Sequence, residues 1–213
     1  MEIRVSPNRM QLLVLKRRHA MAVRGHKLLK DKLDEMLRRF LELVKRDREL
    51  RAEIDSALAN AFQGFLLARA AMSSEAVDAA LMYPKERIKL KASQRTIMNV
   101  AVPSFEWSFE RQGDDSNIYP YGFAYTSSEL DEAIRLLSRS MSKLVELAEV
   151  EKSVELMAYE IERTRRRVNA LEYVLIPNLE RTIKYVTMKL DEAERGNLTR
   201  LMKVKEMVRE RGV

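Results

Sequence analysis

Hydrophobic residues repeat at alternating steps of three and four along the first third of the chain, which is typical of a helix that packs on another helix. With Leu12 as position a of a seven-residue repeat, the a and d positions continue as far as Ala68. Thirteen of these seventeen positions are apolar, whereas the chain-wide apolar fraction of 46% would give about eight. Ser6 is a candidate N-cap, with Pro7 at the first helical position. The pattern predicts one helix from Pro7 to about Met72, about 100 Å long.

A second long helix is predicted in the last third of the chain. It begins near Thr126 and Glu129, which have the spacing of a capping box, and could run to about Arg211. The apolar stripe changes phase near Val150 and again at Pro177. We therefore expect local over- or underwinding of this helix and a kink at the proline.

Neither apolar stripe can stay exposed to water, so the two helices must pack on each other or on a partner. One chain that carries both favours an antiparallel pair. If the turn lies between Met72 and Thr126, facing residues have numbers that sum to about 200, and Lys16 faces the region of Lys184. The second helix then extends beyond the first by about twenty residues.

The segment between the two helices breaks the helical pattern. Residues 73–125 hold three of the five prolines and the only tryptophan, and residues 100–109 alternate between apolar and polar side chains before Gly113 and Asp114. Such a pattern predicts a short β-hairpin or a small loop domain. The expected fold class is therefore all-α: a long antiparallel two-helix coiled coil with a small β-hairpin or loop region at the bend. Its parts are residues 1–72, 73–125 and 126–213.

Cysteine and long apolar runs are both missing from the sequence. The lack of cysteine excludes disulfides, thiolate metal sites and cysteine nucleophiles, and it favours a reducing cytoplasm. The longest apolar runs, such as residues 12–15, are far shorter than the roughly 20 residues that span a bilayer, and no signal-peptide core is present. We expect a chain without a direct transmembrane segment.

Charge is distributed unevenly along the chain, whose formal net charge is +7. Residues 6–30 hold seven basic side chains and no acid, whereas residues 128–160 hold eight acids and four bases. A basic stretch raises nucleic acid as a candidate partner. The run Arg165-Arg166-Arg167 is open to two interpretations, a solvated flank of the coiled coil or a contact with a partner.

No constellation of residues in the sequence indicates catalysis or a cofactor. The two histidines, His19 and His26, lie about 10 Å apart on one helix, too far to share a metal ion, and we interpret them as packed or hydrogen-bonded seam residues or as part of a site shared with a partner. Acid pairs such as Asp34-Glu35 and Asp131-Glu132 are interpreted as solvated. A nucleotide-binding loop needs closely grouped glycines, but the glycines are scattered at positions 25, 64, 113, 122, 196 and 212. We expect no catalytic residue, no metal and no cofactor.

Three sequence motifs resemble those of the D subunit, the central rotor shaft, of the V-type and A-type rotary ATPases. They are Ser6-Pro7-Asn8-Arg9-Met10 before Leu12-Leu13 and Lys16; Arg24-Gly25 before Leu28-Leu29-Lys30 and Lys32; and Thr164-Arg165-Arg166-Arg167-Val168-Asn169-Ala170-Leu171-Glu172 before Ile176-Pro177. The resemblance covers both long helices, about 150 of the 213 residues.

This resemblance implies a non-catalytic central shaft that couples ATP synthesis or hydrolysis in a ring of A and B subunits to proton or sodium transport. The implied partners are the A and B subunits, the small F subunit and a socket subunit above the membrane rotor, and the implied location is cytoplasmic, peripheral to the membrane. Arg17 and Arg24 fall at outward f positions, and Arg166 points outward on the second helix, so none is needed to close the seam. We expect these three arginines to contact partners. The alternative is a basic coiled coil that binds nucleic acid, or a scaffold, and nucleic-acid binding should weaken steeply with salt.

Overall fold

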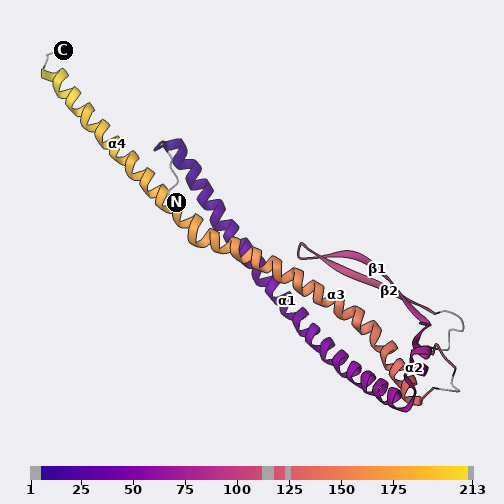
Figure 1. Ribbon diagram of the computed structural model, residues 1–213. Coiled ribbons are helices and arrows are strands. Elements are labelled where there is room, and N and C mark those ends of the chain that lie inside the picture. Colours follow the sequence, from indigo (N-terminus) through magenta and orange to yellow (C-terminus); the bar gives the residue numbers. More distant parts are fainter. Residues whose placement is uncertain (1–5, 112–117, 123–125, 211–213) are drawn as a thin grey trace. The chain divides into compact units, whose positions relative to one another are not determined.

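The computed structural model describes residues 6–111, 118–122 and 126–210 (Figure 1). Along the chain it contains α1 (Arg9–Ala71), α2 (Ser74–Leu81), β1 (Glu86–Ile97), β2 (Val100–Arg111), α3 (Ser128–Ala170), a π-helix η1 (Leu171–Leu175) and α4 (Ile176–Glu210). The chain divides into two compact units. Unit 1 comprises residues 1–35 and 161–213, and unit 2 comprises residues 36–160. In both units helices pair antiparallel, and the only strands among the described residues form one hairpin, which confirms the predicted fold class.

The first helix begins two residues later than predicted. Asn8 is its N-cap: the side-chain Oδ1 accepts a hydrogen bond from the Met10 N–H at 3.3 Å, and the Asn8 carbonyl accepts the first helical bond from the Leu12 N–H at 2.9 Å. The prediction of Ser6 as the cap was therefore wrong. Asparagine is as strong an N-cap as serine, and its side chain satisfies a backbone donor that Ser6 lies too far back to reach.

The second predicted cap also lies elsewhere. The Thr126 hydroxyl donates to the carbonyl of Gly122 at 3.4 Å, and α3 begins at Ser128. The Ser127 N–H contacts the sulfur of Met72 at 3.4 Å. The start of α3 is therefore fixed by contacts with the preceding turn and the end of α1 instead of by the capping box predicted for Thr126 and Glu129.

Unit 1 is held by a narrow apolar seam between α1 and α4. Leu15, Leu179 and Val186 are buried, and Leu12, Ala22, Ile183 and Leu190 pack around them. Polar contacts cross the same seam: His19 lies 3.1 Å from Glu180, His26 lies 3.3 Å from Glu172, and Arg9 forms an ion pair with Glu194. The numbers in each pair sum to about 200, so the predicted antiparallel register is confirmed in this unit.

Unit 2 repeats this register with ion pairs between α1 and α3. Arg46 pairs with Glu146 at 2.8 Å, Arg51 pairs with Glu151, and Lys143 pairs with Glu53 at 2.9 Å. The hydrogen bond from Lys143 lowers the pKa of the Glu53 carboxyl. These pairs are exposed and add little stability individually, but their spacing selects one alignment of the two helices.

Small side chains let the helices of unit 2 approach closely. A Cβ atom added to Gly64 would lie 3.4 Å from the Cβ of Ala133 and 3.4 Å from the carbonyl oxygen of Glu129. Ala68, Ala80 and Leu130 are buried beside this contact. Asp47 interrupts the seam: its Oδ1 is buried and has no hydrogen-bond partner among the described residues. The seam is therefore less stable than it would be with an apolar residue at this a position.

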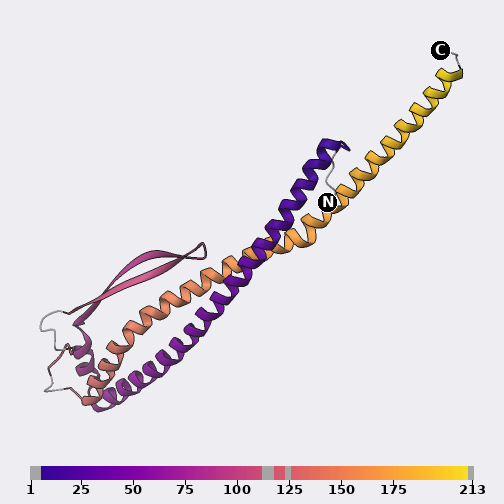
Figure 2. The same ribbon diagram turned by 180° about the vertical axis from the view of Figure 1, so that it is seen from behind.

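The hairpin of β1 and β2 lies along α3 (Figure 2). The Phe105 N–H on β2 donates to the Glu149 carboxylate at 2.9 Å, which ties the hairpin to that helix. The two strands pair from Glu86↔Arg111 to Ile97↔Val100. The turn consists of Met98 and Asn99, both with positive φ (50° and 68°).

The hairpin was predicted, but the position of its turn was not. The partner of the alternating strand precedes it instead of following it, and Gly113 and Asp114 lie outside the described residues. A two-residue turn with both φ values positive matches the right-handed twist of the flanking strands. Asparagine tolerates a positive φ, whereas methionine rarely adopts one and so does not indicate a turn in the sequence. The pairing of residues 100–111 with residues 86–97 therefore determines where the turn lies.

The predicted irregularity at Pro177 is confirmed, whereas α3 runs through Val150 without a break. Residues 171–175 form a π-helix, and the Ile176 N–H donates to the Leu171 carbonyl five residues earlier. Pro177 has no N–H to give to the Tyr173 carbonyl, and its ring would clash with that carbonyl in an α-helix. The wider π-helical turn removes this clash and accommodates the change in phase of the apolar stripe at Pro177.

Candidate functional site

All three arginines predicted to contact partners lie in unit 1 and are exposed. Arg17 has no hydrogen bond or ion pair within the described part of the chain, and Arg24 donates to the carbonyl of Ala20, in its own helix, at 3.3 Å. Arg166 pairs with Glu162, one turn earlier on α3. None of these side chains crosses the seam, so all three are available to another molecule.

The structure does not bring the three arginines into one cluster. Arg17 and Arg24 are seven residues apart and share one face of α1. Arg166 lies on α3, where the antiparallel register sets it opposite residues near 34 instead of near 24. A partner that contacts all three must therefore extend along the helix pair of unit 1.

Positive charge is concentrated in this unit. Residues 6–35 and 161–210 together hold twenty Lys and Arg against eleven Asp and Glu, whereas residues 36–160 hold seventeen against twenty. Unit 1 therefore presents a field that attracts acidic surfaces, and unit 2 does not.

Apolar side chains lie among these charges, and the sequence reasoning missed them. On α1, Leu13, Met21 and Leu28 are 52%, 58% and 70% exposed, and on α4 the Tyr185 and Met188 side chains are also exposed. Lys189 Nζ lies 6.0 Å from the centre of the Tyr185 ring. These apolar residues occupy the b and c positions of the repeat, which are next in sequence to the seam positions a and d but point away from the seam. The surface is thus cationic and apolar together, which suits a protein partner better than a phosphate backbone.

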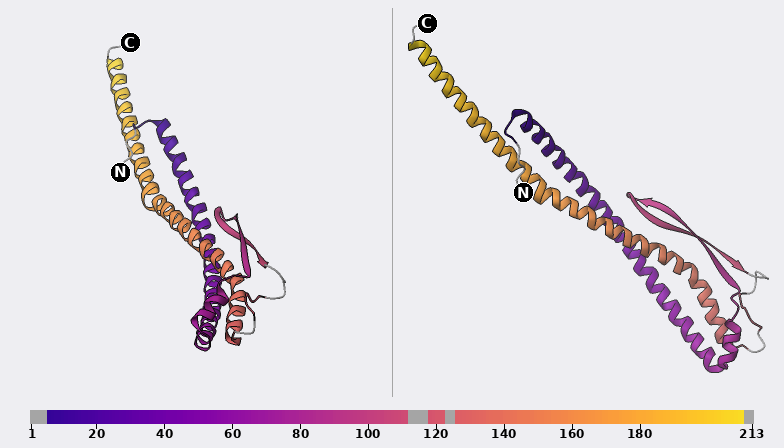
Figure 3. Two further views of the ribbon diagram at one scale, coloured as in Figure 1. Left: turned by 45° about the vertical axis from the view of Figure 1, so that its right-hand side comes forward. Right: turned by 45° about the horizontal axis from the view of Figure 1, so that its top comes forward.

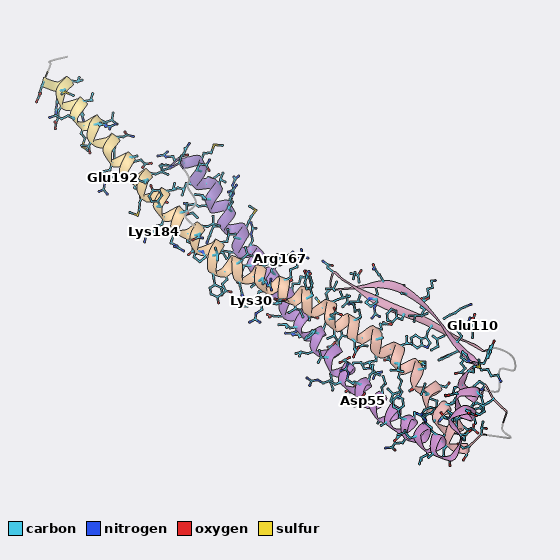
Figure 4. All side chains as sticks on the ribbon, in the orientation of Figure 1. Lys30, Asp55, Glu110, Arg167, Lys184 and Glu192 are labelled. Carbon is cyan, nitrogen blue, oxygen red and sulfur yellow. The ribbon has the colours of Figure 1, made fainter. Side chains whose placement is uncertain are left out.

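The end of α4 has no helix beside it in the described part of unit 1 (Figure 3). Every residue from 191 to 210 is exposed, and the side chains project outward along the helix beyond Glu192 (Figure 4). Apolar residues recur here at helical spacing, at Leu198, Leu201, Val204 and Val208. Basic residues accompany them at Arg195, Arg200, Lys203, Lys205 and Arg209, while Arg211 lies outside the described residues. A helix with this pattern is amphipathic and buries its apolar stripe only against another molecule.

The histidines are hydrogen-bonded seam residues, as one of the two interpretations predicted. Each is tied to a glutamate of the opposite helix, His19 to Glu180 and His26 to Glu172. Within the described residues, no group of three or more His, Asp or Glu side chains could hold a metal ion. Over the same residues, no helix is long and apolar enough to cross a membrane.

Comparison with known proteins places these features in one family. The sequence profile of the ATP synthase D subunit family matches residues 11–206. The D subunit of the V-type ATP synthase of Acetivibrio thermocellus is 58% identical over 208 residues, which cover 98% of this chain and 93% of that protein. The corresponding V-type ATP synthase protein of Clostridium novyi is 56% identical, with coverage of 97% and 95%, and that of Thermoanaerobacter pseudethanolicus is 54% identical, with coverage of 97% of both. The chain therefore belongs to the family of V-type ATP synthase D subunits and is a component of a rotary ATPase.

Proposed function

We propose that this chain is the central shaft of the complex and transmits rotation between the catalytic ring and the ion-transporting membrane rotor. The observation that carries this proposal is the surface of unit 1. An exposed cationic and apolar face continues onto twenty exposed residues of α4. Such a surface requires a surrounding partner, and a ring of A and B subunits would enclose it on all sides.

Torque transmission requires that two helices do not slide past each other. In unit 1 the apolar seam of Leu15, Leu179 and Val186 is flanked by three polar contacts across the pair. In unit 2 three ion pairs hold the same register. A slip by one residue would break these contacts and move apolar side chains out of the seam. The helix pair therefore resists axial sliding.

A shaft acts as a cam only when its faces differ. Arg17 and Arg24 give one face of α1 a positive charge, whereas Tyr185 and Met188 give part of α4 an exposed apolar character. Each catalytic subunit of a ring would meet these faces in turn as the shaft rotates. Since a ligand or partner shifts a conformational equilibrium only through differential contacts, distinct faces can favour open or closed catalytic sites.

The shaft itself is proposed to be non-catalytic and to bind no nucleotide, because its scattered glycines cannot form a phosphate-binding loop. Its proposed partners are the A and B subunits around unit 1, together with the small F subunit and the socket subunit above the membrane rotor. We place it on the cytoplasmic side of the membrane as a peripheral part of the complex.

A reversible crosslink tests this function, because the native chain has no cysteine to interfere. Lys184 is exposed on α4, so Lys184→Cys can be joined by a disulfide to a cysteine introduced in the facing loop of the ring. If the shaft must turn, oxidation should abolish most ATP turnover and reductant should restore it. The same complex with only one of the two cysteines is the control. Full turnover by a complex that is completely crosslinked would contradict the proposal.

A further inference from the structure

Asp47 is the only acidic residue at the a and d positions of α1, and the native helix pair does not use its charge. Its side chain is half-buried, and its Oδ1 is buried without a hydrogen-bond partner among the described residues. The next seam residues, Leu50 and Ile54, are buried and apolar. Because a buried acceptor without a partner lowers stability, the stability of the native pair does not account for Asp47.

Two arginines flank Asp47 on α1. In the seven-residue repeat Arg46 is at position g and Arg51 at position e, where charges select which helices pair. Across the seam Arg46 pairs with Glu146 at 2.8 Å, and Arg51 pairs with Glu151. The pairing of α1 with α3 therefore neutralises both arginines.

The register of unit 2 sets an apolar residue opposite Asp47. Gly64 packs against Ala133, and the residue numbers of this contact sum to 197. The same sum sets Asp47 opposite Val150. The native pair thus has a single carboxylate at this layer of the seam.

A different helix would meet the same layer with like charges. The chain is synthesised from its N-terminus, so the 63 residues of α1 exist before α3 can cover their apolar stripe. The α1 helix of a second copy carries an identical stripe. In a parallel, in-register pair each a position faces its own copy, and each g position faces the following e position. Asp47 would then face a second Asp47, and Arg46 of each copy would face Arg51 of the other.

We propose that Arg46, Asp47 and Arg51 form a specificity layer that directs α1 to α3 of its own chain and prevents parallel pairing with α1 of a second copy. The native pair leaves one carboxylate oxygen without a partner. The mispaired dimer would bring together two carboxylates and make two arginine–arginine contacts, and like charges across an interface are unfavourable. Specificity is the difference between these two free energies. This proposal goes beyond the shaft function, because it concerns how the chain selects its own helix.

Disulfide trapping during refolding of the full chain tests the proposal, since the native chain has no cysteine. Ala57→Cys places a thiol at a d position, where a parallel, in-register dimer brings two copies together. After dilution from denaturant under oxidising conditions, the chain that also carries Asp47→Leu should give about fivefold or more disulfide-linked dimer than Ala57→Cys alone, because the facing carboxylates are gone. Asp55→Leu is the matched control, since Asp55 is exposed on α1 and lies outside the seam (Figure 4). Equal dimer yields from Asp47→Leu and Asp55→Leu would overturn the proposal.

The position of the thiol identifies the kind of dimer. Ala59 is exposed at an outward f position, so Ala59→Cys should not trap a dimer that forms through the seam. If Asp47→Leu raised the yield as much with Ala59→Cys as with Ala57→Cys, the dimer would not be the predicted pair and the proposal would be wrong.

An exchange of charges tests the arginines separately. Arg51→Glu together with Glu151→Arg keeps opposite charges between α1 and α3 but replaces the arginine–arginine contacts of the mispaired dimer with attractive ones. With Ala57→Cys, this exchange should raise the dimer yield about threefold or more. An unchanged yield would refute the role of the arginines.

Thermal melting tests whether Asp47 destabilises the native pair. Asp47→Leu in the cysteine-free chain should raise the melting temperature by about 3 °C or more, because it removes an unpaired buried acceptor and adds an apolar contact. A lower melting temperature would show that Asp47 stabilises the native pair and would contradict the proposal. None of these measurements involves the ring, so their failure would leave the rotor proposal to its own test, the Lys184→Cys crosslink.

Discussion

Changing Arg17, Arg24 and Arg166 together to Glu is expected to leave the fold intact but to weaken assembly with the A and B subunits or slow ATP-driven rotation. All three side chains are exposed and none crosses the seam. Exposed charges usually alter the free energy of unfolding by only about 0.5 kcal/mol each. A carboxylate introduced in place of Arg166 would also repel Glu162 one turn away, again by about 0.5 kcal/mol or less.

The effect on the complex should be much larger. If the ring supplies acidic loops, each reversal sets like charges against each other, which costs up to several kcal/mol across an interface. The measurements are the dissociation constant of the chain for the ring, at two salt concentrations, and the ATPase rate of the reconstituted complex. Arg48, Arg69 and Arg139 are exposed arginines of unit 2 and provide a control triple of equal charge change. If the complex that carries the Arg17, Arg24 and Arg166 variant assembles and hydrolyses ATP like the wild type, these arginines are only a solvated face.

Val186→Asp is expected to be the most destabilising single change in unit 1. Val186 is fully buried between Leu15 and Leu179, and the described residues give no cation in that cluster to pair with a new carboxylate. Losing the apolar contact and burying an unpaired charge should together cost about 3 kcal/mol or more. Tyr185→Asp changes the adjacent, 54% exposed position and should cost about 0.5 kcal/mol or less.

Hydrogen exchange shows which part of the chain each of the two substitutions destabilises. With Val186→Asp, amides of residues 9–30 and 176–190 should lose protection, because the seam of unit 1 opens, while amides of α1 and α3 in unit 2 keep theirs. Equal protection in the two variants would show that α1 and α4 are not held by this seam. Loss throughout the chain would show that the two units unfold together.

The helices and their register could be predicted because they depend on a local period repeated many times. Seam positions such as Leu15, Leu50 and Ala68 recur every seven residues, and the contacts of His19 with Glu180 and Arg51 with Glu151 follow once the chain turns back on itself. The exposure of Arg17 and Arg24 follows from the same period. A repeated signal tolerates interruptions such as Asp47, because neighbouring turns supply the missing contacts.

The features that escaped prediction depend on single residues or on contacts far apart in the sequence. Asn8 and Ser6 are both good N-caps, so composition alone could not choose between them. Met98 adopts a positive φ because the strands on either side of it pair, and the conformational preference of methionine does not predict this φ. The open groove of unit 2 that is lined by Phe62, Leu137 and Phe109 forms only when α1, α3 and the hairpin pack together. These features follow from packing and not from a local pattern.

The most direct test of the account is to watch this chain inside the complex. With the A and B ring fixed to a surface and a probe attached to unit 2, addition of ATP should drive continuous rotation of the chain in one direction. The rotation should stop when Lys184→Cys is crosslinked to the ring. A complex that hydrolyses ATP at its full rate while this chain stays fixed relative to the ring would contradict the proposal that the chain is the shaft.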